Sequence, residues 1–201
     1  MHKVFISFHH ANDQYYKEQL LFFNNLYDIF LDHSVDTGDI DDDLDDSTIR
    51  EIIRDEYLQD STVTILLVGT ETRNRKHVDW EIYSSMYDGR VNKKSGILVV
   101  NLPIVNCTNH IAVHLGEKER VYPDITNWKS IDNRTECDSL FPYMPPRIID
   151  NLLKKDAKVS VVDWNRIMSD PDTLSFLIDA TYNDRVSCNY DLSRPMRRAN
   201  S

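Results

Sequence analysis

The sequence predicts one α/β domain with a mainly parallel sheet, and three observations support this prediction. Four short runs are nearly continuous in Val, Ile, Leu and Phe, which is typical of strands covered on both faces. Helical or irregular stretches separate these runs, and such alternation favours a sheet sandwiched between helices. The 201 residues, of which 41% are hydrophobic and 28% charged, provide enough apolar material for one sizeable core.

The strands are predicted from these apolar runs. A weaker fifth candidate is FLDHSV, at 30–35. The four stronger ones are KVFISF at 3–8, TVTILLV at 62–68, GILVVNL at 96–102 and KVSVVDW at 158–164.

The helices are predicted from apolar periodicity and capping signals. In the stretch 13–30, aromatic residues and Leu20 recur at alternating spacings of four and three, which indicates an amphipathic helix. A second helix is expected to start near Thr48, which forms a capping-box pattern with Glu51. A third runs from about Val78 to Tyr87. Two more are expected near 146–156 and 171–182.

The remaining sequence is less regular. We expect residues 1–182 to form a single domain in which 103–145 is an irregular insertion, with one short strand near Arg120–Tyr122. Insertions of this length are usually functional or mobile. Residues 183–201 form a polar, Arg-rich tail that we expect to be loosely held.

Charge and cysteine content exclude several function classes. A net charge of −10 disfavours general binding to nucleic acid or to an anionic membrane, so a bound nucleotide would have to be met by local geometry. No apolar run approaches the roughly 18 residues that cross a bilayer, and we expect a cytoplasmic protein. The cysteines Cys107, Cys137 and Cys188 form no CxxC pair, which argues against a disulfide framework or a cysteine zinc site.

Common cofactor and metal motifs are not found. The five glycines are not placed to form a GxGxxG or Walker loop, and neither GxSxG nor HExxH occurs. His110 and His114 have the spacing of paired metal ligands but lack an obvious third ligand. The acidic run 36–46 fails the EF-hand template, because Leu44 replaces its glycine. We therefore expect no metal and no resident cofactor.

Two segments carry a resemblance to a known family. The opening KVFISFHHAND combines a hydrophobic strand with Ser7, Phe8 and Asp13, and STVTILLVGTETRNRKHVDWEI leads through a loop to Trp80 and Glu81. Together they resemble the Toll/interleukin-1 receptor (TIR) family, and most closely its bacterial branch in the Thoeris anti-phage defence system. The resemblance covers residues 2–102 well and 103–182 loosely. It implies a flavodoxin-like, three-layer TIR fold.

The resemblance also implies an activity. TIR-like enzymes of this branch split NAD+ at the nicotinamide–ribose bond and make a cyclic ADP-ribose isomer, a second messenger that activates a partner NAD-depleting effector. NAD+ is thus a substrate, and the expected partners are NAD+, the Thoeris effector through a diffusible nucleotide and, in addition, a second copy of the chain. Such an enzyme is expected to be silent without a phage trigger. On the family pattern Glu81 takes the position of the catalytic glutamate.

The residue chemistry is compatible with that role. Cleavage passes through an oxocarbenium-like state, which one carboxylate stabilises, and nicotinamide leaves without protonation. On the helix from Val78 to Asp88, Glu81 shares an arc with Ser84, whose small side chain leaves room for a ribose. The alternative is that Glu81 is an ordinary solvated glutamate at a helix start.

The remaining candidate substrate contacts follow strand ends, where ligands sit in parallel sheets. Ser7 is expected to bond a phosphate, Phe8 to stack on a ring, and His9 to lie beside them, while Asp36 orients a ribose hydroxyl. Each has a plainer alternative: turn capping for Ser7, core packing for Phe8, a loop histidine for His9 and exposure for Asp36.

Two other functions stay open. Typical TIR domains carry a Trp-Cys pair where this chain has His77-Val78, which favours a non-enzymatic TIR adaptor acting by homotypic or partner assembly. The run of aspartates also permits a flavodoxin-like phosphotransfer or nucleotide-binding domain.

Overall fold

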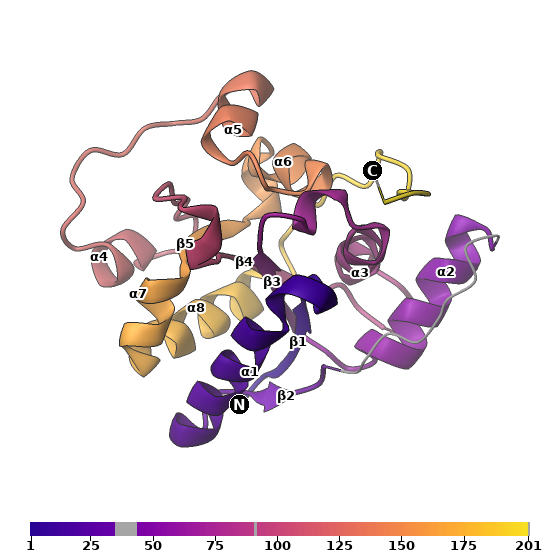
Figure 1. Cartoon of the computed structure of the whole chain (residues 1–201), viewed down its shortest axis with the longest axis horizontal. Coiled ribbons are helices and arrows are strands. Elements are labelled where there is room, and N and C mark those ends of the chain that lie inside the picture. Colours follow the sequence, from indigo (N-terminus) through magenta and orange to yellow (C-terminus); the bar gives the residue numbers. More distant parts are fainter. Residues whose placement is uncertain (35–43, 91, 201) are drawn as a thin grey trace.

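The computed structural model of the chain describes residues 1–34, 44–90 and 92–200. Within these residues a five-stranded, all-parallel sheet has the order β2-β1-β3-β4-β5. Helices cover both faces of the sheet, which confirms the predicted three-layer α/β fold (Figure 1). The strands are β1 (Lys3–Ser7), β2 (Leu31–Asp32), β3 (Val63–Val68), β4 (Gly96–Asn101) and β5 (Ser160–Asp163).

All five predicted strands are present, although β2 is only two residues long. The α-helices are α1 (His10–Tyr27), α2 (Asp46–Ile52), α3 (Lys76–Met86), α4 (Glu117–Val121), α5 (Arg134–Leu140), α6 (Pro146–Leu152), α7 (Trp164–Ser169) and α8 (Pro171–Asp184). Short η helices are η1 (Ile53–Leu58), η2 (Thr72–Asn74), η3 (Pro103–Val105) and η4 (Lys155–Ala157).

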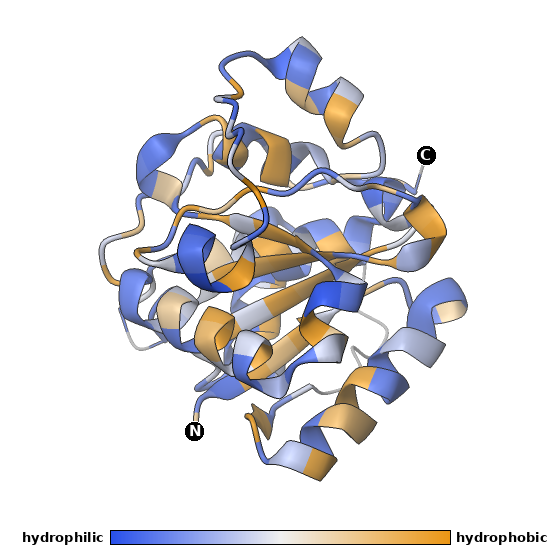
Figure 2. Ribbon diagram, turned by 90° about the vertical axis from the view of Figure 1, so that its left-hand side faces the viewer, coloured by the Kyte–Doolittle hydropathy of each residue, from blue (hydrophilic) through white to orange (hydrophobic). Residues whose placement is uncertain are grey.

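Alternate residues of each strand face different helical layers. Ile65 of β3 belongs to the core cluster with Leu20 of α1 and Leu177 of α8. Leu66, the next residue, belongs to the cluster with Ile82 of α3, on the other face. Figure 2 shows the strands as an apolar layer between more polar helices. This alternation decides which layer each side chain at the end of β1 meets.

Two local sequence predictions are wrong in detail. The second helix starts at Asp46 because Asp45 is its N-cap and accepts hydrogen bonds from the backbone N–H groups of Ser47 and Thr48. The expected strand near Arg120–Tyr122 is the end of helix α4, which follows Gly116 at φ 75°. Val121 and Tyr122 both belong to the core, so their apolar side chains are buried by a helix end and not by a strand.

The C-terminal segment 185–200 is not loosely held, contrary to expectation. Cys188, Tyr190 and Met196 are buried, and the Tyr190 hydroxyl donates to the carbonyl of Ser95 at 3.1 Å. These apolar side chains, spaced among polar ones, fix the segment against α3 and α6. The chain end therefore lies beside the helix that carries Glu81 (Figure 1).

Candidate functional site

Glu81 is a buried carboxylate that faces the end of β1. Its side chain is 2% exposed, so the alternative of a solvated glutamate is wrong. The hydroxyl of Ser7, the last residue of β1, donates to Glu81 Oε2 at 2.6 Å. The two residues are 74 positions apart in sequence, and the fold brings them together. A hydrogen bond of this length fixes the orientation of the Glu81 side chain.

Glu81 is buried together with the other polar residues on the same arc of helix α3. Ser84 and Ser85 are fully buried, and the hydroxyls of Ser85 and Thr64 lie 2.8 Å apart. The Ser84 Oγ makes no hydrogen bond within the described part of the chain. Ser84 therefore leaves an unpaired donor one turn beyond Glu81, where a ligand hydroxyl could bind.

Phe8 does not join the Ser7–Glu81 pair. Because neighbouring strand residues point to opposite faces, Phe8 lies in the core cluster of α1 and stacks on His10 at 4.3 Å. The ammonium of Lys17 sits 5.2 Å from the ring centroid. Phe8 thus has the core-packing environment that was its alternative.

His9 lies between β1 and α1, as the residue that precedes the helix. It is half-buried, and its Nδ1 makes no hydrogen bond within the residues described. Burial, reinforced by the positive charge of Arg75, lowers the pKa of His9. Asp36, the last predicted contact, lies outside the described residues.

A second acidic side chain near this edge was not predicted from the sequence. Asp13 is 2% exposed, and Thr72 donates to its carboxylate at 3.4 Å. The carboxylate lies against Gly69, where an added Cβ would approach its oxygens to 2.4 Å. Burial raises the pKa of Asp13 to about 6. In sequence, Asp13 looked like a residue that only starts a helix.

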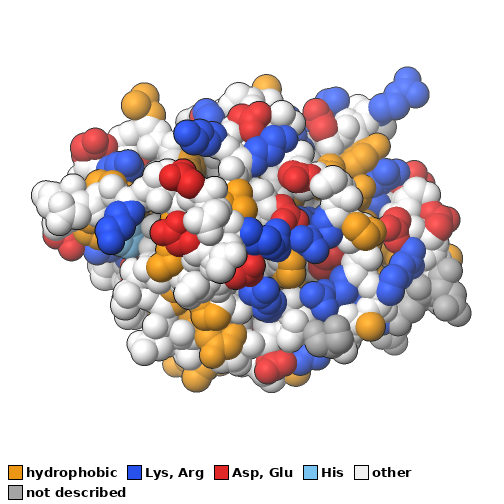
Figure 3. All heavy atoms as spheres, turned by 90° about the horizontal axis from the view of Figure 1, so that it is seen from above, with side chains coloured by type: hydrophobic (Ala, Val, Ile, Leu, Met, Phe, Trp, Pro, Cys, Tyr) orange, Lys and Arg blue, Asp and Glu red, His pale blue; other side chains and the backbone are white. Residues whose placement is uncertain are grey.

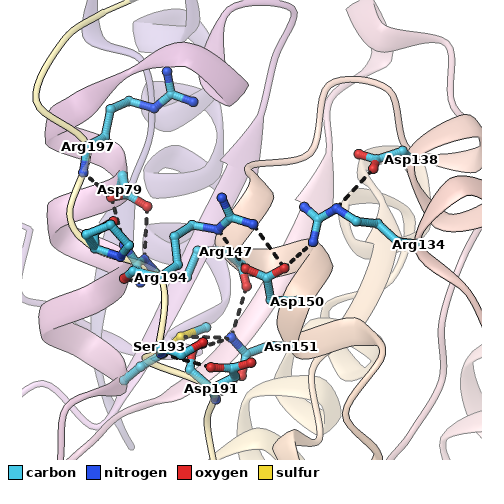
Figure 4. A network of polar contacts seen from close by, with 12 residues as sticks. Asp79, Arg134, Asp138, Arg147, Asp150, Asn151, Asp191, Ser193, Arg194 and Arg197 are labelled. Atoms are coloured by element: carbon cyan, nitrogen blue, oxygen red, sulfur yellow. Dashed lines mark hydrogen bonds and ion pairs between the residues drawn. The ribbon is translucent and has the colours of Figure 1, made fainter.

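A network of ion pairs holds α3 from its other side, and this too was not predicted. Arg147 of α6 donates from Nε and Nη2 to the two oxygens of Asp79, both at 2.9 Å. Its side chain is fully buried and also donates to the carbonyls of Arg194 and Pro195. The backbone N–H of Arg197 also donates to Asp79 Oδ2, at 2.9 Å. Figure 4 shows these side chains between α3, α6 and the C-terminal segment.

The surface above this network is mixed in charge. Asp150 pairs with Arg194 at 2.6 Å and also with Arg134. From this side, Lys and Arg side chains lie in the middle of the face with Asp and Glu among them (Figure 3). Only the buried pair, Arg147 with Asp79, is shielded from water and salt.

Little of the Ser7–Glu81 pair is accessible to solvent, because Ser7 is fully buried and Glu81 is 2% exposed. None of the three cavities described for the molecule is lined by Ser7 or Glu81. The described residues contain no group of three or more His, Cys, Asp or Glu side chains arranged to hold a metal ion. No helix among the described residues is long and apolar enough to cross a membrane.

With this geometry in place, comparison with known families is decisive. The family "Thoeris protein ThsB, TIR-like domain" matches residues 5–106, a span that holds both Ser7 and Glu81. The chain belongs to this ThsB TIR-like family. Membership supports a role in anti-phage defence and confirms the resemblance seen in the sequence. No curated protein matches the chain.

Proposed function

We propose that this ThsB-family protein cleaves NAD+ at the nicotinamide–ribose bond and cyclises the product to a cyclic ADP-ribose isomer. The observation that carries the proposal is the Ser7–Glu81 contact, in which a buried carboxylate is oriented at the carboxyl edge of a parallel sheet. Ligands bind at this edge in open α/β folds. Family membership adds that the pair lies within the TIR-like part of the chain.

The chemistry needs one well-placed carboxylate. As the bond from ribose C1′ to the nicotinamide nitrogen breaks, nicotinamide leaves with the electron pair and positive charge develops on the sugar. Glu81 stabilises that charge, while the Ser7 hydroxyl keeps its carboxylate aligned. A nucleophilic group of the same nucleotide then attacks C1′ and loses a proton, so the product has the mass of ADP-ribose minus water.

The burial of Glu81 supports a mechanism by which the enzyme is inactive at rest. A substrate cannot touch a carboxylate that is 2% exposed unless neighbouring groups move. Activity therefore requires an opening step, and binding of a phage-derived trigger supplies the free energy for it. The messenger then diffuses to the partner NAD-depleting effector, so the two proteins need not touch.

The test is the Glu81→Gln variant in cells, with and without phage challenge. Mass spectrometry should find a product of ADP-ribose mass minus water in challenged wild-type cells, reduced at least about 100-fold in the variant. Glu56→Gln, the same change at an exposed position, is the matched control and should leave the product unchanged. A folded Glu81→Gln protein that forms as much product as wild type rules out the proposal.

One observation favours the alternative, a non-enzymatic TIR adaptor acting by homotypic or partner assembly. Tyr15, Phe22 and Leu26 of α1 are each more than 60% exposed, which is unusual for large apolar side chains on one helix. Light scattering should detect concentration-dependent assembly that the double variant Phe22→Ser/Leu26→Ser abolishes. If defence then fails while the nucleotide product persists, assembly is the function; if the product is also lost, assembly serves catalysis.

A further inference from the structure

A cavity of about 720 Å³ lies at the β5 edge of the sheet. One wall comes from the segment that joins β4 to α5, and the other from the end of α6, from η4 and from the two residues that precede β5. In Figure 1 the stretch between α4 and α5 arches away from the sheet on this side. The volume is within the range of small-molecule sites.

Five lysines line this cavity, although the protein carries ten more acidic than basic charges. Asp132 is the sole carboxylate among the lining residues, and it accepts a hydrogen bond from Ser130 at 2.6 Å. The lysines stand on both walls, so an anion in the cavity would be held from two sides. They are Lys118, Lys129, Lys154, Lys155 and Lys158.

Most of this positive charge is not neutralised by the protein. Lys158 pairs with Asp184 at 2.7 Å. The side chains of Lys129, Lys154 and Lys155 form no hydrogen bond or ion pair within the part of the chain that the structure describes, although Lys154 interacts electrostatically with Asp191. Gathering like charges costs free energy, and an anionic ligand recovers it. We propose that this lysine cavity binds a nucleotide carrying at least two phosphates.

The aromatic and apolar parts of the lining distinguish a nucleotide from phosphate alone. Trp128 is half-buried in the wall, and the ammonium of Lys118 lies 4.6 Å from its ring centroid. The floor is formed by aliphatic side chains, among them Ile131 and Val159. A base can pack on this surface while its phosphates reach the lysines, as in sites that stack bases on aromatic residues.

The lysine cavity is separate from the candidate catalytic site. Glu81 contacts β1, which is three strand spacings, about 14 Å, from β5 in the sheet. A nucleotide bound there would not touch Glu81. The inference therefore stands independently of NAD+ cleavage, and the Glu81→Gln variant should bind the ligand as wild type does.

Equilibrium dialysis of the full chain with ATP tests the proposal. The double variant Lys154→Gln/Lys155→Gln should weaken ATP binding about tenfold, and rising salt should weaken binding to wild type. The matched control, Arg90→Gln/Lys93→Gln, removes two exposed positive charges from the α3–β4 connection and should change binding less than about twofold. Trp128→Leu should weaken binding of ATP but not of inorganic triphosphate.

Five results would overturn the assignment. ATP binding could be undetectable, unchanged in the lysine double variant, or weakened equally in the control. Inorganic triphosphate could bind as tightly as ATP, which would leave a phosphate site without base recognition. Hexaglutamate could bind more tightly than ATP, which would point to an acidic peptide instead. Because Trp128 supports the core, thermal unfolding of its variant must show that it remains folded.

Discussion

The region around α3 and the cavity at the β5 edge hold their charged side chains in opposite ways. On the α3 side, Glu81, Asp79 and Arg147 are buried and hydrogen-bonded at fixed distances. On the β5 side, Lys129 and Lys155 are exposed at a cavity. A buried charge is expensive unless its partners are in place, so the first region couples chemistry to stability. In the second region, substitution of a charged side chain should change the free energy of folding very little. Such freedom suits a site that binds ligands from solution.

Removing Arg147 should have the largest effect. In Arg147→Leu, Asp79 loses its bidentate partner inside the protein, and we expect the free energy of unfolding to fall by about 3–5 kcal/mol. Urea unfolding followed by circular dichroism measures this. Arg134→Gln, which removes a half-exposed arginine from Asp150, should cost about 1 kcal/mol or less. Equal losses of stability in the two variants would contradict the expectation that the buried ion pair contributes more than the half-exposed one.

Removing the Ser7 hydroxyl should act on both stability and turnover. In Ser7→Ala the Glu81 carboxylate loses a donor at 2.6 Å, and we expect a loss of about 1–2 kcal/mol in stability and about tenfold in product formation. Ser61→Ala is the comparison, because Ser61 is buried but its hydroxyl makes no hydrogen bond in the described structure. A Ser7→Ala protein with full activity would show that Glu81 needs no such alignment.

Asp13 makes stability depend on pH. Its folded pKa of about 6 exceeds its ordinary value of 3.8, so the folded state binds the proton more tightly. The stability that this proton contributes is complete below about pH 4 and is lost as the pH rises through 6. Asp13→Asn should therefore raise the free energy of unfolding by about 1 kcal/mol at pH 8, with no gain at pH 4. Urea unfolding of wild type and variant at pH 4 and pH 8 measures the stability difference between the two proteins. A difference that is the same at both pH values would contradict the prediction.

The smallest effect is expected on the β5 side. Lys154→Gln/Lys155→Gln should leave the free energy of unfolding within about 0.5 kcal/mol of wild type, because neither lysine forms an ion pair in the described structure. Thermal unfolding without ligand measures it. A clear gain in stability would show that the lysines repel one another strongly, and a clear loss would show that they support the fold.

The sequence predicted what depends on local pattern. Continuous apolar runs located four of the five strands, and the weaker candidate 30–35 contained the fifth. The segment ending in Trp80 and Glu81 located the candidate carboxylate, because its neighbours in sequence carry the motif. It could not predict that Glu81 is buried, because its arc of the helix is polar. The layer assigned to Phe8 also depends on which face of β1 meets α1, which a run apolar on nearly every residue does not reveal.

Contacts across long sequence separations were beyond prediction. Asp79 and Arg147 are 68 residues apart, and although Asp79 lies in the segment that carries the family resemblance, nothing in the sequence indicated its partner. The cavity lysines are spread from position 118 to 158, and two of them lie in the irregular segment 103–145, so nothing in the sequence indicated that they converge. Asp13 appeared to be a first-turn acid, and its raised pKa arises from burial, where it lies against Gly69.

The buried ion pair joins two parts of the chain that differ in their relation to the family. Asp79 lies inside the matched span 5–106, whereas Arg147 and the carbonyls of Arg194 and Pro195 lie beyond it. Substitution of either partner alone leaves an unpaired charge in the interior, which is strongly destabilising. We therefore expect the two positions to change together among relatives. Among relatives, an apolar residue at position 79 should accompany loss of the arginine at 147, and the C-terminal segment should vary with both.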